Sequence, residues 1–131
     1  MTIKAGPFYF SESHEWISKK ADNIFYMGIS DFAQSELGDV VYITLPEAGK
    51  IYQKGEKIGE IESVKSVSEI YAPVSLKILS INSNLNDSSE LINTDPHGSG
   101  YIAMVEPLNS SDVLDLMDKN TYESFVSSNH A

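Results

Sequence analysis

Lys65 is the residue in this sequence whose type and setting best suit chemistry, as an acceptor of a covalent group. It lies within EIESVKSVSEIYA (60–72), between two runs typical of short strands, with the small side chains of Ser63 and Ser66 beside it. A lysine amine becomes a good nucleophile where burial or a second cation lowers its pKa, and the neighbouring residues predict neither. An exposed amine on a protruding turn is instead suited to amide formation by another enzyme.

The local pattern also allows a simpler interpretation. Lys65 is one of nine lysines, and an ordinary surface lysine at a turn is the more frequent meaning of so short a motif. Glu62 and Glu69 place negative charge on either side of the turn, which fits both interpretations. The local sequence therefore leaves a modification site and a plain surface lysine open.

The composition excludes several classes of protein. The chain has no cysteine, so it can form no disulfide, thiol nucleophile or thiolate-bound metal site. Its formal net charge of −10 comes from 9 lysines and 19 acidic residues, with no arginine. Such a charge repels phosphate backbones and argues against nucleic-acid binding. It either maintains solubility or steers the chain toward basic partner surfaces.

Membrane insertion and metal binding are not expected either. No apolar run approaches the roughly 18 residues that cross a bilayer, and no export signal is visible at the N-terminus. His14, His97 and His130 are far apart, and none has a second ligand at helical spacing. We expect His14 to pack near Trp16.

The spacing of apolar residues and turns predicts a mainly β fold, either a sandwich or a barrel. Strands are expected around 14–17 and over 23–29, 40–45, 57–64, 67–71, 77–81 and 101–105. Within 57–64, the alternation places Ile58 and Ile61 on opposite faces of the strand.

Two helices are expected in addition. A short one begins after Ser30 or Asp31 and ends at Gly38. A closing helix is expected over 110–126, begun by one of the polar residues at 110–112. Its apolar stripe is expected to contribute to the core, and the residues expected in it are Leu114, Met117, Phe125 and Tyr122.

A short internal repeat suggests two similar half-sheets. LPEAGKI ends at Ile51 and APVSLKI ends at Ile78, and both contain Pro, three residues and then Lys-Ile. The junction between the two halves then falls near Lys65. We expect a single domain over 1–131, with its core at about 8–126.

Longer segments carry a family resemblance. SHEW (13–16), SDFAQSELGDVVYITLPEAG (30–49), KGE (54–56), GEIESVKSVSEIYAPVS (59–75) and ELINTDPHGSGY (90–101) occur in an order that resembles the H protein of the glycine cleavage system. The resemblance covers roughly 13–105, which is much more specific than the lysine segment alone.

The resemblance implies a lipoyl/biotinyl-type barrel-sandwich hybrid with lipoate bound covalently to Lys65. It matches Glu62 and Glu69 to acidic positions that help a lipoate ligase or lipoyl transferase recognise the lysine. It also matches Ser13, Glu15 and Glu69 to a cleft that shelters the loaded arm. Capping of a strand end remains an equal interpretation for Ser13 and Glu15.

The implied role is that of a non-catalytic carrier with a swinging arm. In the family, the arm accepts an aminomethyl group from glycine decarboxylase and passes the one-carbon unit to aminomethyltransferase, and dihydrolipoyl dehydrogenase reoxidises it. The hard chemistry belongs to the cofactor and the partners. The implied location is the cytoplasm in a bacterium or the mitochondrial matrix in a eukaryote.

The second half of the chain departs from the family pattern. Leu76 replaces a usual glycine and requires a different backbone there, whereas Gly49, its counterpart in the repeat, is retained. His97, Tyr101 and Ser89 stand where Tyr, Trp and Pro are usual. These departures keep open a second function, an H-like lipoyl carrier or relay that does not serve glycine cleavage.

Two further functions are disfavoured. A biotin carrier usually has methionine on both sides of the lysine, and here the neighbours are Val64 and Ser66. An autonomous enzyme would need a nucleophile with its base, and the sequence offers no convincing pair.

Overall fold

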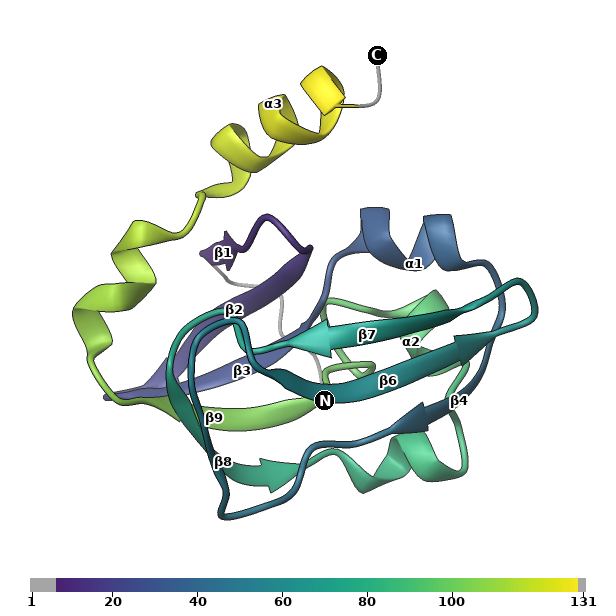
Figure 1. Cartoon of the computed structure of the whole chain (residues 1–131), viewed down its shortest axis with the longest axis horizontal. Helices are drawn as coiled ribbons and strands as arrows, with labels where there is room; N and C mark the ends of the chain where they lie inside the picture. The colour runs from purple at the N-terminus through teal and green to yellow at the C-terminus, as the bar shows by residue number, and fades with distance from the viewer. Residues whose placement is uncertain (1–6, 130–131) are drawn as a thin grey trace.

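The computed structural model describes residues 7–129, which form two antiparallel sheets packed face to face (Figure 1). The larger sheet has the order β1-β2-β3-β9-β8-β5 and the smaller one β4-β6-β7. The strands are β1 Phe8–Phe10, β2 Glu15–Ala21, β3 Ile24–Ile29, β4 Val40–Thr44, β5 Ile51–Tyr52, β6 Lys57–Ser63, β7 Val67–Tyr71, β8 Leu76–Ile81 and β9 Ala103–Pro107. The predicted mainly β class is confirmed, and the sheets form a sandwich without closing into one barrel.

Helix α1 (Asp31–Leu37) begins and ends where the sequence predicts. The Ser30 hydroxyl caps it by accepting a hydrogen bond from Ala33 N–H, and Gly38 follows with a φ of 76°. Strands β1 and β5 were not predicted, because runs of three and two residues are too short to show a period. Short helical turns, η1 (Ser83–Asn86) and α2 (Leu91–Thr94), connect β8 to β9.

Strand β6 corrects the predicted alternation. Ile58 and Ile61 are both buried, although they are three residues apart in one strand. A register shift between Lys57 and Gly59 in the pairing with β7 accounts for this, because a bulge moves the following side chains to the other face. A Cβ at position 59 would collide with the Thr44 carbonyl oxygen, so this close strand approach requires glycine.

The closing helix is also corrected. The segment forms a 3-10 helix, η2 (Ser110–Asp115), capped by Asn109 rather than by residues 110–112, and a separate helix α3 (Lys119–Asn129). Met117 separates them by exchanging backbone hydrogen bonds of 2.8 and 2.9 Å with Phe10. Because Leu114 lies in η2, its side chain is 73% exposed instead of joining the apolar stripe.

Two apolar clusters hold the sandwich together. The larger lies between the sheets, and the smaller joins Phe10, Trp16 and Tyr26 to Tyr122 of α3, with Met117 and Phe125 packed against it. The predicted core role of these three C-terminal side chains is therefore confirmed.

The two repeat segments lie against each other. Strand β5 pairs with β8, and Gly49 N–H donates to the Ile78 carbonyl at 2.7 Å. Gly49 has a φ of 86°, which favours glycine, whereas Leu76 is an extended strand residue whose side chain is fully buried. The replacement of the usual glycine thus adds an apolar side chain to the core.

Candidate functional site

Lys65 lies exposed at the tip of the β6–β7 hairpin. The Ser63 hydroxyl accepts hydrogen bonds from the backbone N–H groups of Lys65 and Ser66, at 3.2 and 3.1 Å, and Ser63 N–H donates to the Ser66 carbonyl at 2.8 Å. Val64 N–H donates to the Asp39 carbonyl at 3.0 Å, which ties the turn to the segment between α1 and β4. The lysine therefore projects from an ordered turn.

The Lys65 side chain leans across the end of α1. A Cβ at position 38 would lie 2.9 Å from Lys65 Cε, so the glycine leaves room for the lysine stem. The Gly38 carbonyl accepts a hydrogen bond from Asn93 Nδ2 at 2.8 Å, which fixes this junction to α2. The amine is thus exposed while its stem rests beside helix α1.

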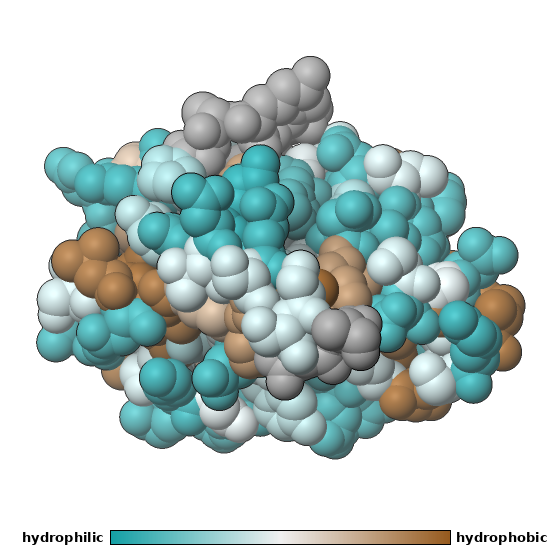
Figure 2. All heavy atoms as spheres, turned by 90° about the horizontal axis from the view of Figure 1, so that it is seen from above, coloured by the Kyte–Doolittle hydropathy of each residue, from teal (hydrophilic) through white to brown (hydrophobic). Residues whose placement is uncertain are grey.

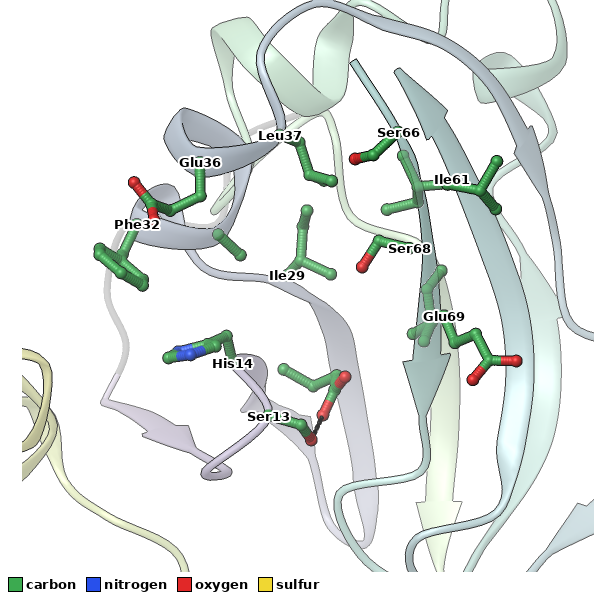
Figure 3. Close-up of a pocket in the computed structure, with 14 residues that line it drawn as sticks. Ser13, His14, Ile29, Phe32, Glu36, Leu37, Ile61, Ser66, Ser68 and Glu69 are labelled. Atoms are coloured by element: carbon green, nitrogen blue, oxygen red, sulfur yellow. Dashed lines mark hydrogen bonds between the residues drawn. The ribbon is translucent and has the colours of Figure 1, made fainter. Parts of the chain in front are cut away.

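A cleft of about 380 Å³ opens next to this stem, between α1 and β7 (Figure 3). Its apolar wall includes Ile29, Leu37, Ile61 and Ile70, and Ser66 and Val67 place its edge directly after Lys65. A group attached to Lys65 could therefore fold back into an adjoining cavity.

Glu15 lies in this cleft and is 1% exposed. Its Oε1 accepts hydrogen bonds from Ser13 Oγ at 2.5 Å and Ser11 Oγ at 2.7 Å, and its Oε2 accepts one from Tyr71 N–H at 3.1 Å. Burial raises the pKa of the Glu15 carboxyl, and the three donors only partly oppose that shift. The structure thus brings Ser13 and Glu15 together around a poorly solvated carboxyl group.

Glu69 borders the same cleft, but its carboxylate is directed away from Ser13 (Figure 3). It accepts a hydrogen bond from the Tyr71 hydroxyl at 2.6 Å and lies 3.4 Å from Lys57 Nζ. The Tyr71 bond, followed by Lys57, lowers the pKa of Glu69. Glu62 is exposed on the outer face of β6, so the structure separates Glu62 and Glu69 from the Ser13–Glu15 pair.

Helix α3 contacts His14, a residue of the cleft wall, through Tyr122. Its hydroxyl lies 2.7 Å from His14 Nδ1 and 2.7 Å from Ser30 Oγ, and Ser30 is the cap of α1. The His14 ring packs against Phe32 and Tyr122, at centroid distances of 5.0 and 5.7 Å. Because His14 lines the cleft, α3 supports one of its walls.

His97 stands at the other side of the α1 N-terminus. Its Nε2 accepts a hydrogen bond from Asp31 N–H at 3.0 Å, and its ring lies 5.8 Å from that of Trp16. Burial lowers the pKa of His97, which favours the neutral acceptor form. The third histidine, His130, lies outside the described residues.

Four contributors to the site were not predicted: Ser11, Gly38, Tyr71 and Tyr122. Ser11 carried a usable signal, because serines two and four residues before Glu15 can both reach its carboxyl group. The other three contribute through contacts between distant parts of the chain, which local spacing does not reveal.

The fold and the tip together define a carrier domain: a β sandwich that presents one exposed lysine on a hairpin beside a cleft. The model of the glycine cleavage H-protein family matches residues 8–129, and the chain belongs to that family. Its members are non-catalytic lipoyl carriers. No helix within residues 7–129 is long and apolar enough to span a membrane.

Curated relatives and a solved structure agree with this assignment. The probable glycine cleavage system H protein of Pyrococcus abyssi is 46% identical over 127 residues, covering 96% of this chain and 93% of the relative. The H protein of Listeria monocytogenes is 46% identical over 117 residues, covering 89% and 93%. The crystal structure of the Mycobacterium marinum H protein superposes with a TM-score of 0.82 at 33% identity, covering 96% of this chain and 98% of that one.

Proposed function

We propose that the chain is the lipoyl carrier that shuttles the aminomethyl group of glycine between the decarboxylase and aminomethyltransferase components of the glycine cleavage system. The observation that carries this proposal is the placement of Lys65. Its amine is exposed at an ordered hairpin tip, and its stem lies beside a cleft that contains a buried acceptor, Glu15.

The residues of the tip fit a covalently attached lipoyl group. The exposed Lys65 amine can form the amide, and the adjoining cleft has an apolar wall for a hydrocarbon chain and a polar end at Ser13 and Glu15. When attached, the group supplies a disulfide that takes up the aminomethyl unit and is regenerated by oxidation. The chain supplies the tether, which raises the local concentration of the arm at each partner's active site.

Glu15 is placed to receive a cationic nitrogen. A carboxylate offers about four acceptor sites, and within the described residues Oε1 accepts from the two serine hydroxyls whereas Oε2 accepts from the Tyr71 N–H. A cation held there would favour the ionised carboxylate and oppose the effect of burial on its pKa. The side chains around it, Ile29 and Ile70, keep bulk water away from the bound group.

The partners that follow from this role are glycine decarboxylase, aminomethyltransferase, dihydrolipoyl dehydrogenase and a lipoate ligase or lipoyl transferase. We propose a single carrier domain over 1–131 with its core at about 8–126. Its location is the cytoplasm in a prokaryote, the kind of organism that the relatives come from, and the mitochondrial matrix in a eukaryote.

Intact mass spectrometry after incubation with lipoate, ATP and a lipoate ligase tests the attachment site. We expect one lipoyl adduct on the wild-type chain, none on Lys65→Arg or Lys65→Ala, and an unchanged adduct on the control Lys54→Arg. A full adduct on Lys65→Arg would assign the cofactor to another residue.

The second candidate function, an H-like lipoyl carrier outside glycine cleavage, rests on the departures in the second half of the chain, at Leu76, Ser89, His97 and Tyr101. Leu76 is fully buried, and Ser89, His97 and Tyr101 are partly buried, so none of the four is a fully exposed change of the surface, which favours the first candidate. Exchange of labelled bicarbonate into glycine by the decarboxylase separates the two. A fully lipoylated chain that supports no exchange would select the second candidate.

A further inference from the structure

His14, which lines the cleft, has an uncommon backbone conformation. Its φ is 76°, and among the described residues other than glycine only His14 and Asn23 have a positive φ. This left-handed conformation is strained for a residue that has a Cβ, and it persists only where the surrounding structure imposes it. The strain therefore indicates that contacts from other parts of the chain hold His14 in place.

Backbone hydrogen bonds fix the turn around His14. His14 N–H donates to the Ser11 carbonyl at 3.0 Å, and the His14 carbonyl accepts from Ser30 N–H at 2.9 Å. Ser11 N–H donates to the Glu15 carbonyl at 2.9 Å, which closes the turn. The hydroxyls of Ser11 and Ser13 both donate to Glu15 Oε1. The conformation of His14 therefore sets how these two serines meet the buried carboxyl group.

The imidazole ring of His14 is held by Tyr122 of helix α3. The Tyr122 hydroxyl lies 2.7 Å from His14 Nδ1 and 2.7 Å from Ser30 Oγ. Ser30 Oγ also accepts from Ala33 N–H at 3.1 Å, as the cap of α1. With the ring neutral and its proton on Nε2, each of the two hydroxyls donates once and accepts once. One continuous chain of hydrogen bonds then joins α1 and α3 to the strained residue.

Helix α3 is anchored firmly enough to hold this ring. Tyr122 is 5% exposed, and its ring stacks on Phe10 with a centroid distance of 4.1 Å and an interplanar angle of 6°. Met117, just before α3, exchanges backbone hydrogen bonds with Phe10. Figure 2 shows the side of the molecule that carries α1 and α3, and its surface is mainly hydrophilic, which agrees with a Tyr122 side chain turned inward. The hydroxyl therefore projects from a fixed ring.

We infer that Tyr122 is a positioning residue for the cationic group on the arm: through His14, it holds Ser13 and Glu15 in the arrangement that receives this group. The inference rests on the proposed function and gives helix α3 a part in it. Tyr122 is not among the described residues that line the cleft, so it acts through His14, which is. Without the hydroxyl, the strained turn loses a contact and relaxes, and water then reaches the Glu15 carboxyl group.

A purely structural role for Tyr122 predicts a different result. If its hydroxyl served only to attach α3, its removal would lower the free energy of unfolding and leave the Glu15 carboxyl group as buried as before. The positioning role predicts less burial of that group, and burial is the main cause of the raised pKa of Glu15. The pKa of Glu15 in the unmodified chain therefore separates the two roles.

Carbon-13 NMR titration of the full-length, unmodified chain measures this pKa, and Glu15→Gln identifies the signal. We expect Tyr122→Phe to lower the pKa of Glu15 toward its usual value of 4.5, because water replaces part of the apolar surroundings. The matched control is Tyr101→Phe, which removes a hydroxyl from a tyrosine packed against the same smaller apolar cluster. It should leave the pKa of Glu15 unchanged.

Two substitutions of His14 repeat the test from the other end of the contact. Asparagine tolerates the left-handed conformation, and its side-chain amide can take the place of Nδ1 toward the Tyr122 hydroxyl. We therefore expect His14→Asn to keep the raised pKa of Glu15. Alanine resists a φ of 76° and offers Tyr122 no polar atom, so His14→Ala should lower that pKa.

Retention of the loaded group gives a second readout. The lipoylated chain is reduced with a water-soluble phosphine and loaded with formaldehyde and ammonia. Hydrolysis reverses the loading: one water is consumed, the C–S bond breaks, and the free thiol, formaldehyde and ammonium are released. We expect formaldehyde release to be about three- to tenfold faster from Tyr122→Phe than from the wild type or Tyr101→Phe, the factor that corresponds to one lost hydrogen bond.

The outcomes for the inference and for the proposed function are separable. A wild-type pKa of Glu15 in both Tyr122→Phe and His14→Ala would overturn the inference, and so would a lowered pKa with unchanged formaldehyde release. Thermal unfolding shows that each variant is folded, and should Tyr122→Phe fail to fold, the two His14 variants decide. If the wild-type chain accepts no lipoate, the proposed function fails, while titration of the unmodified chain still shows whether Tyr122 positions Glu15.

Discussion

Glu15 and Glu69 are both glutamates that border the cleft beside Lys65, yet the pKa of one is raised and that of the other lowered. Glu15 lies inside, where loss of water outweighs three hydrogen bonds. Glu69 directs its carboxylate outward, where the Tyr71 hydroxyl and Lys57 favour its charge. One hairpin therefore separates a desolvated carboxyl group from a solvated one.

The difference in solvation between Glu15 and Glu69 suits the two sides of the hairpin to different interactions. The inner side suits a cation that has left water, because a charge there is weakly screened and strongly attracted. On the outer side, the Glu69 carboxylate is exposed and its charge is already favoured by the Tyr71 hydroxyl and Lys57, so it does not need a further cation. The predictions that follow compare the inner side with the outer side.

The largest effect is expected for Glu15→Ala. This change leaves the Ser11 and Ser13 hydroxyls and the Tyr71 N–H without their acceptor and opens a small cavity. We expect a loss of about 2–3 kcal/mol in the free energy of unfolding. Urea denaturation measures it, and Glu69→Ala, on the exposed side, should shift the midpoint much less, because it removes only the solvent-exposed contacts with Tyr71 and Lys57. Equal losses for the two variants would contradict the division between the sides.

Gly38→Ala tests whether the Lys65 stem is held toward the inner side. Both the φ of 76° and the contact with Lys65 Cε oppose a Cβ, and we expect a cost of about 1–3 kcal/mol. Gly55→Ala is the matched control, since its φ is 83° and nothing lies within 4 Å of the added Cβ.

The readout that separates these two glycines is the rate of Lys65 acetylation by a small reagent, followed by peptide mass spectrometry. Displacing the stem in Gly38→Ala should change this rate, whereas Gly55→Ala should not. Identical rates would mean that the lysine stem does not rest on the helix end.

Tyr122→Phe tests the support that α3 gives to the inner wall. It removes the hydroxyl that contacts His14 and Ser30 while keeping the ring stacked on Phe10. We expect a loss of about 1–2 kcal/mol in the free energy of unfolding. Chemical denaturation measures it, and an NMR spectrum should show shifts at His14. An unchanged His14 signal would show that the Tyr122 hydroxyl does not support the cleft wall at His14.

The smallest effect is expected in the pH dependence of the folding stability that Glu15 and Glu69 contribute. Because the folded pKa of Glu15 lies above the usual value of 4.5, its protonation favours folding. That contribution is present in full below pH 4.5 and is lost as the pH rises through the raised pKa. Glu15→Gln should remove this dependence from a series of denaturation curves.

Glu69 has the opposite sign. Its folded pKa lies below 4.5, so its contribution is present above that pH and is lost as the pH falls through the lowered pKa. Glu69→Gln should therefore affect only the acidic limb of the stability profile. The same slope for both variants would show that the two carboxyl groups share one environment.

Much of this protein could be predicted from patterns within short segments. The helix from Ser30 to Gly38 and most of the strands follow from capping, turn and alternation rules. The prediction of one continuous closing helix was wrong because Met117 pairs with Phe10. This backbone contact between distant segments separates η2 from α3. The predicted alternation in β6 was wrong because the bulge near Gly59 depends on the close approach of Thr44.

By itself, the sequence determined the mainly β class, the turn that carries Lys65 and the family resemblance, because local propensities and motif order are written along the chain. Only the tertiary structure decided that Glu15 is buried with Ser11, Ser13 and Tyr71 N–H, that Glu69 faces outward, and that the lysine stem rests on Gly38. These properties depend on which distant groups exclude water from one another, and that exclusion arises only when the two sheets and the helices pack together.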